Sequence, residues 1–200
     1  MTPVHPGIQA ARRFAREHDS EPEHAFQVCK TSLQLFDGLV ERHGLGAAER
    51  RLLEAAALLH DTGYDVDPVR HHKISRDLIV DSRLEGFTKE QLAIVACVAR
   101  YHRKAHPDQT HRVYRDLSRR ARSVVDRLAA ILRVGDGLDR SHSACTCGVR
   151  IEQKGTALRL LVQQRRPNPI DIEGALRKRQ WFEEVFKVRL DIVPVPMERG

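Results

Sequence analysis

The chain has 200 residues, of which 41% are hydrophobic and 30% charged, with a formal net charge of +7. This length suits one domain with a substantial core. No apolar run approaches the ~20 residues of a membrane span, and Met1–His5 lack a signal-peptide pattern, so we expect a cytoplasmic protein without membrane association. The positive charge favours anionic partners. Because aromatic residues are only 5% and no nucleic-acid-binding motif is present, nucleic acid is less favoured than phosphorylated small molecules or polyphosphate.

Helices are predicted over the first two thirds of the chain, because apolar residues there recur at intervals of three and four. Thr88 and Gln91 form the pattern of a capping box, and the stretch that begins at Pro107 is expected to be polar and flexible. In chain order, the predicted helices cover residues 7–18, 22–40, 47–60, 71–80, 88–101 and 118–134.

The pattern changes after residue 143. Residues 149–152 and 157–162 predict a β-hairpin around Gly155, residues 171–187 a helix, and residues 188–193 a third strand. The expected fold class is therefore mainly α: a helical domain over residues 1–143, with a small α+β subdomain over residues 144–200. We expect the subdomain to share the core of the helical part, because about 55 residues form a marginal independent unit.

Four cysteines are expected as free thiols, in keeping with a cytoplasmic location. Cys145 and Cys147 are separated by one residue, a spacing that is poor for structural zinc. A strand or a bend at this position is favoured over a redox or zinc role.

His60 and Asp61 stand directly after the apolar run 52–59 and before the helix-breaking Gly63. Two polar side chains at the end of a core helix are costly unless a partner satisfies them. A metal ion is one such partner, because imidazole nitrogen and carboxylate oxygen are both good ligands. A hydrogen-bond network without metal is the alternative.

Other histidines and aspartates also fall at helix ends. His24 and His71 open predicted helices, whereas His102 and Asp136 close them. If these ends meet on one rim of a bundle, they form a cage for one or two divalent ions. Such a centre supports hydrolysis, because a metal ion lowers the pKa of water and two ions together stabilise a phosphoryl group.

This arrangement resembles the H…HD…D pattern of the HD-domain phosphohydrolase superfamily. A closer resemblance is to the C-terminal HD-type domain of the exopolyphosphatase/guanosine-pentaphosphatase (Ppx/GppA) family, over about residues 20–195. The stretches that support it are LLHDTGY (58–64), HHK (71–73), ARYHRK (99–104) and LAAILRVGDGLDRSH (128–142).

The resemblance implies an HD-domain helical bundle and a possible homodimer. It implies ligands for one divalent ion (Mn, Fe, Ni, Zn or Mg) at His24, His60, Asp61 and Asp136, and for a second ion at His71 and His102. Arg103 stands where some two-metal members have another histidine. In that family the phosphatase chemistry resides in an N-terminal actin-like region. These 200 residues contain no such region, so polyphosphatase activity is not carried over.

Two hypotheses follow. The first is a metal-dependent phosphohydrolase, in which His60 and Asp61 are catalytic and metal-activated water attacks a nucleotide or another phosphorylated metabolite. The alternative is a non-catalytic anion-binding module for polyphosphate, guanosine polyphosphate or nucleic acid. In either case, the expected phosphate-binding residues are Lys73, Arg100, Arg103, Lys104 and Arg140.

Three aspartates lie near these positions. Asp139 is expected to orient Arg140, and Asp65 and Asp67 either support the ligands or shape a turn. The remaining histidines are expected at the surface or in loops: His5, His18, His43, His106, His111 and His142.

Overall fold

A computed structural model describes residues 5–196 of the chain. The first four residues, part of the segment inspected for a signal peptide, lie outside the described residues, as do the last four. The elements in chain order are α1 (Pro6–His18), α2 (Pro22–Gly38), α3 (Val40–His43), α4 (Ala47–Leu59), α5 (His71–Asp81), α6 (Lys89–Arg100), α7 (Arg112–Arg115), α8 (Arg119–Gly137), β1 (Thr146–Lys154), β2 (Ala157–Gln164), α9 (Pro169–Phe186) and β3 (Leu190–Pro196).

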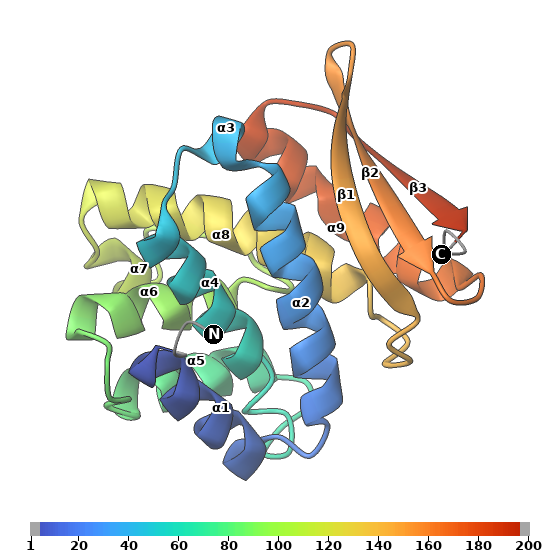
Figure 1. Cartoon of the computed structure of the whole chain (residues 1–200). Coiled ribbons are helices and arrows are strands. Elements are labelled where there is room, and N and C mark those ends of the chain that lie inside the picture. The colour runs from blue at the N-terminus through green and yellow to red at the C-terminus, as the bar shows by residue number, and fades with distance from the viewer. Residues whose placement is uncertain (1–4, 197–200) are drawn as a thin grey trace.

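The molecule consists of a helical body with a small sheet at one side (Figure 1). Helix α9 lies beside α8 and connects the body to the sheet, and β1 packs against α2. The predicted class, mainly α with a small C-terminal α+β part, is confirmed. No described helix is long and apolar enough to span a membrane.

Helix α4 lies at the centre of the body and packs against α1, α2, α6 and α8. From Leu52 to Leu59, every residue except Glu54 is buried. Full burial of each leucine stabilises the fold by about 1.5–3 kcal/mol, so this part of the helix is held rigidly. Its C-terminal end therefore has a fixed place in the body.

The sheet has the order β1-β2-β3. Strands β1 and β2 form the predicted antiparallel hairpin, and β3 pairs with β2 in parallel after the crossover through α9. Strand β1 begins at Thr146, earlier than predicted, so Cys147 lies in the strand, as the favoured interpretation of this segment expected. All four cysteines are free. Strand β3 begins only at Leu190, because Lys187 ends α9 in a left-handed conformation (φ 52°).

One expectation about local structure is confirmed, and another differs from the fold. The predicted capping box of α6 is present: the side chains of Thr88 and Gln91 accept each other's backbone N–H at 3.2 and 2.9 Å. The stretch after Pro107 is not simply polar, since it contains α7 and the buried Tyr114, whose hydroxyl donates to Asp126 Oδ1 at 2.8 Å.

His43 is buried rather than at the surface, which corrects the expectation for this histidine. Its Nε2 donates to the carbonyl of Phe36 at 2.8 Å, and its Nδ1 accepts from the N–H of Leu45 at 2.9 Å. Both ring nitrogens of the neutral imidazole thus have partners, which offsets the cost of burial.

The apolar core is continuous between the helical body and the C-terminal segment. Leu132 of α8, Leu160 of β2 and Phe182 of α9 belong to one buried cluster. Helices α8 and α9 approach closely at Gly137, where an added Cβ would lie 2.6 Å from Cα and 2.7 Å from N of Ala175. The absence of a side chain at this position sets the distance between the two helices.

We expect Gly137→Ala to lower the free energy of unfolding by about 1–3 kcal/mol, because backbone atoms of α9 must move to admit the methyl group. Denaturant titration measures this loss. Gly38→Ala is a matched control, since Gly38 also ends a helix and its Cβ would come no closer than 3.3 Å to any atom of Ile151. Equal losses in the two variants would contradict the prediction.

Candidate metal centre

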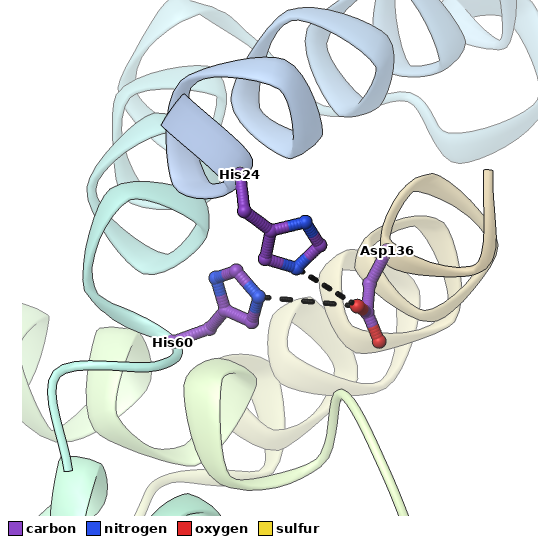
Figure 2. Close-up of side chains that lie close together, drawn as sticks. All are labelled: His24, His60 and Asp136. Atoms are coloured by element: carbon purple, nitrogen blue, oxygen red, sulfur yellow. Dashed lines mark ion pairs between the residues drawn. The ribbon is translucent and has the colours of Figure 1, made fainter. Parts of the chain in front are cut away.

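Three helix ends bring His24, His60 and Asp136 together (Figure 2). His24 lies in the first turn of α2, His60 caps the C-terminal end of α4, and Asp136 lies in the last turn of α8. Oδ1 of Asp136 is 3.5 Å from Nε2 of His24 and 3.9 Å from Nε2 of His60. All three residues are buried.

Asp61 lies between this group and two further histidines. Its Oδ2 is 3.8 Å from Nε2 of His24 and 3.6 Å from Nε2 of His60. Its Oδ1 is 3.2 Å from Nε2 of His71 and 3.5 Å from Nε2 of His102. All six residues predicted as metal ligands are therefore gathered at one place, with one carboxylate facing both sets of imidazoles.

Gly63 allows His71 to reach this position. An added Cβ there would lie 2.7 Å from Cβ of Ile74 and 2.8 Å from the carbonyl oxygen of His71. The Gly63 N–H also donates to Ser75 Oγ at 3.0 Å. The loop that follows Asp61 thus packs directly on the first turn of α5, which holds His71 beside the carboxylate.

The four imidazoles share one feature: Nδ1 of each faces an oxygen acceptor. A carbonyl oxygen accepts but cannot donate, so the facing Nδ1 carries the proton. The acceptors are the Ala57 carbonyl for His60 at 2.8 Å, the Ala99 carbonyl for His102 at 2.7 Å, the Pro68 carbonyl for His71 at 2.8 Å and Asp139 Oδ2 for His24 at 2.9 Å.

When Nδ1 carries the proton, a neutral ring directs the lone pair of Nε2 into the cluster. Among the described residues, His60 Nε2 and Asp61 Oδ1 make no hydrogen bond although both are buried. Nε2 of His71 and of His102 lie 3.2 Å apart, so two lone pairs face each other. Donors that share an ion at about 2.0–2.2 Å lie roughly 3–4 Å apart, so this donor set fits a divalent cation.

The protonation states support the same conclusion. Burial lowers the pKa of His60 and His71, and it lowers the pKa of His102 well below the ordinary value. These imidazoles are therefore neutral near pH 7 and available as ligands.

Positive side chains surround the cluster. Nη1 of Arg103 is 3.2 Å from Nε2 of His71, and Nζ of Lys104 donates to the carbonyl of Val69 at 2.8 Å. Arg103, Lys104 and Arg140 line a cavity of about 540 Å³ that opens onto Asp61 and Asp136. These three predicted phosphate-binding residues are thus beside the candidate metal centre.

The structure does not bring the other two predicted phosphate-binding residues to this cavity. Lys73 is exposed on α5, and Arg100 lines a different cavity. Both stand next to ligand segments in the sequence, but a helix directs neighbouring residues to different faces.

Sequence analysis missed Lys178 of α9. Its ammonium group contacts Oδ2 of Asp136, and burial lowers its pKa to about 7. Arg177 and Glu173 of the same helix also line the cavity and pair with each other at 3.2 Å. The sequence placed this helix with the small subdomain, so nothing in the local pattern connected it with the histidines.

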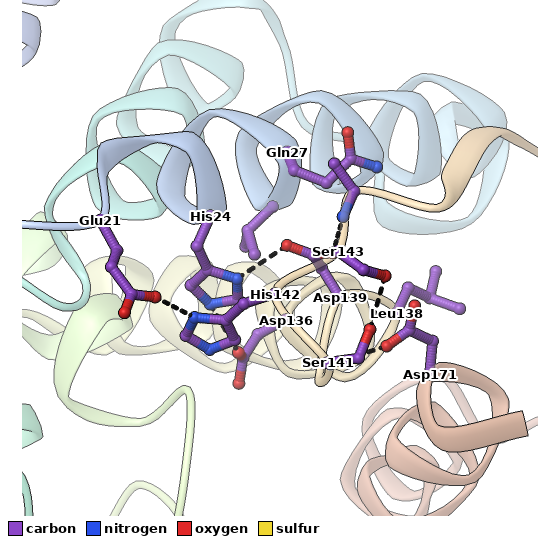
Figure 3. Close-up of polar contacts among 12 residues, drawn as sticks. Glu21, His24, Gln27, Asp136, Leu138, Asp139, Ser141, His142, Ser143 and Asp171 are labelled. Carbon is purple, nitrogen blue, oxygen red and sulfur yellow. Dashed lines mark hydrogen bonds and ion pairs between the residues drawn. The ribbon is translucent and has the colours of Figure 1, made fainter. Parts of the chain in front are cut away.

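A second layer of contacts holds His24 (Figure 3). Asp139, which accepts from His24, also accepts the N–H of Ala144 at 2.8 Å. His142 stacks on His24 with ring centroids 3.9 Å apart, and its Nδ1 is 2.6 Å from Oε2 of Glu21. Asp139 therefore orients His24. His142 is exposed in a turn, as expected, and it also forms part of the wall of the site.

Asp65 and Asp67 act in local structure. Asp65 accepts the N–H and the hydroxyl of Ser20 at 3.1 and 2.7 Å, and Asp67 accepts the N–H of Val69 and of Arg70. Neither residue lines the cavity. The turn interpretation therefore describes Asp67, whereas Asp65 connects its loop to Ser20 in the segment before α2.

A comparison with known protein families identifies the family of this chain. Residues 8–168 match the family model described as Ppx/GppA phosphatase, domain III. The chain belongs to the Ppx/GppA phosphatase family. The matched segment includes all six clustered His and Asp residues, whereas Lys178 lies outside it. The relation to a phosphatase family that the sequence motifs indicated is thus shown.

We expect the stability of the protein to fall between pH 7 and pH 5, measured by denaturant titration with a chelator present. The unfolded chain has histidine pKa values near 6.5, above those of His60, His71 and His102 in the folded state. Below about pH 6.5 the unfolded state therefore binds more protons, and the stability present at neutral pH is lost as the pH falls. His102→Leu should make this dependence shallower. Stability at pH 5 equal to or greater than that at pH 7 would contradict the conclusion that these imidazoles are neutral in the folded protein.

Proposed function

We propose that this protein is a metal-dependent phosphohydrolase of the HD type, acting on a nucleotide or another phosphorylated metabolite through metal-activated water. The observation that supports it most is the convergence of four Nε2 lone pairs with the carboxylates of Asp61 and Asp136. Buried nitrogen and oxygen lone pairs without a hydrogen-bond partner destabilise the fold unless a cation binds them. The family relation adds a link to phosphate chemistry.

In this proposal, His24, His60, Asp61 and Asp136 hold one divalent ion. His71 and His102, with Asp61 shared between the two sets, hold a second. A mixed nitrogen and oxygen donor set suits Mn, Fe, Ni, Zn or Mg. A bound ion supplies Lewis-acid polarisation of a phosphoryl oxygen and lowers the pKa of water.

The positively charged residues of the cavity wall are proposed to bind the phosphate group. Arg103, Lys104, Arg140 and Lys178 place positive charge around the opening to Asp61 and Asp136. Guanidinium groups bind phosphate oxygens in pairs, and an ammonium group acts as a compact point charge. These side chains therefore orient a phosphate group against the metal ligands and offset its charge.

A non-catalytic anion-binding module is the second candidate. The same cationic wall favours it, because these side chains bind a phosphate chain whether or not it is cleaved. In that case, anion binding would survive removal of metal and would weaken with salt.

Asp61→Ala tests the proposal directly. We expect it to lower metal content from one or two ions per chain to nearly none, and to reduce turnover at least a hundredfold, because Asp61 faces both groups of histidines. Metal analysis and a screen of phosphate esters with added Mn²⁺ or Fe²⁺ provide the readouts.

Asp65→Ala is the matched control, since Asp65 follows closely in the chain but pairs with Ser20. Full activity in Asp61→Ala would contradict the proposal. Wild-type protein that binds anions without metal and cleaves none of the esters would favour the second candidate.

Lys178→Met should raise KM for the best ester about tenfold or more, because the cavity loses its most buried positive charge. Metal content should stay at the wild-type level. Lys154→Met, at the exposed end of the β-hairpin, is the control for loss of one lysine. An unchanged KM would show that Lys178 only balances the charge of Asp136.

A further inference from the structure

Arg100 is a buried arginine without a polar partner. It ends α6, it is 7% exposed, and it makes no hydrogen bond or ion pair with any residue from 5 to 196. Its guanidinium lies over the ring of Tyr101, with 5.7 Å from the guanidinium carbon to the ring centroid. A buried charge without a counter-charge or acceptor is strongly unfavourable.

Arg133 shows that burial alone does not explain this state. It is 8% exposed, nearly the same as Arg100, but it donates to the carbonyls of Tyr101 at 2.9 Å and Lys104 at 3.4 Å. The Nη atoms of Arg133 therefore have acceptors, although its Nε, like that of Arg100, has none among the described residues. Arg100 lacks them within the described part of the chain.

The guanidinium of Arg100 lines a cavity of about 120 Å³ between α5, α6 and α7. Arg76, Arg112 and His111 also line it, and Asp77 is the only acidic residue there. Asp77 is engaged with Arg76, whose Nε and Nη2 donate to its two oxygens at 2.8 and 2.7 Å. Three arginines thus face one carboxylate that is already paired, so the cavity has excess positive charge.

We propose that this cavity binds a phosphate group, with the guanidinium of Arg100 as its principal donor. Several forked guanidinium groups around one small volume match a tetrahedral oxyanion, which offers more acceptors than a carboxylate. The cavity has room for a group of a few heavy atoms, whereas sites for whole drug-sized ligands occupy ~300 Å³ or more. The phosphate is either the free ion or the end of a larger molecule that extends from the surface.

This site is separate from the candidate metal centre. The two cavities share no lining residue among those described. Arg100 and His102 lie two residues apart on the chain, but one faces the arginines of α5 and α7 and the other faces Asp61. The inference therefore stands whether or not the proposed hydrolysis is correct.

The test is a titration of inorganic phosphate into the whole chain, followed by calorimetry and thermal unfolding at constant ionic strength. It uses the Asp61→Ala background, which removes metal-dependent phosphate binding at the other cavity, and the comparison with Arg100→Met isolates the site of Arg100. A ligand that binds the folded state raises the unfolding temperature. We expect Arg100→Met to weaken phosphate binding tenfold or more and to remove most of this rise.

In phosphate-free buffer, Arg100→Met should unfold at or above the temperature of its parent, because it removes an unpaired buried charge. Arg76→Met is a second variant that should also weaken phosphate binding, and Arg150→Met, with its side chain 69% exposed, is the surface control.

Adenosine monophosphate in place of phosphate distinguishes the two sources of the phosphate group. Binding of both compounds indicates that the cavity admits the end of a larger molecule, and binding of phosphate alone indicates the free ion. Unchanged phosphate affinity in Arg100→Met and Arg76→Met, or no phosphate binding by their parent, would overturn the inference.

Discussion

The hydrogen bonds from Nδ1 of four histidines determine the chemistry of the cluster. Backbone carbonyls hold His60, His71 and His102, and a buried carboxylate holds His24. Each bond fixes both the orientation of a ring and the nitrogen that keeps the proton. Because the carbonyl acceptors belong to the segments that hold the histidines, the ends of α4 and α6 and the start of α5 prepare the ligands before any ion arrives. The placement of these helix ends then decides whether the lone pairs meet.

The sequence predicted the parts of this arrangement that depend on local pattern. The apolar run of α4 indicated a core helix, and residue types at helix ends, together with the family motifs, indicated His24, His60, Asp61 and Asp136. Periodicity also predicted every long helix, because a helix that buries one face has apolar residues at intervals of three and four. Short elements such as α7 were missed, since one turn contains too few residues to show a period.

Contributions from distant elements were not predictable in the same way. Lys178 reaches Asp136 only because α9 crosses behind the sheet and packs closely on α8 at Gly137. Arg100 was grouped with the phosphate-binding residues through its closeness to His102 in sequence, but the helix directs it to another cavity. His142 is exposed in a turn, as expected, but its stacking on His24 was not predicted. In each case the deciding fact is the packing of two elements, which no short stretch of sequence contains.

The distribution of the clustered donors along the chain affects when an ion can bind. In the sequence, more than 100 residues lie between His24 and Asp136, although their side chains meet in the fold. The other metal-binding atoms come from three segments between these two residues. Local folding of any one helix pair brings together only part of the set. Closing the chain between such distant residues has an entropic cost that the whole core must offset. In the proposed centre, ion binding would therefore be coupled to completion of the global fold, and bound metal would distinguish fully folded molecules from partly folded ones.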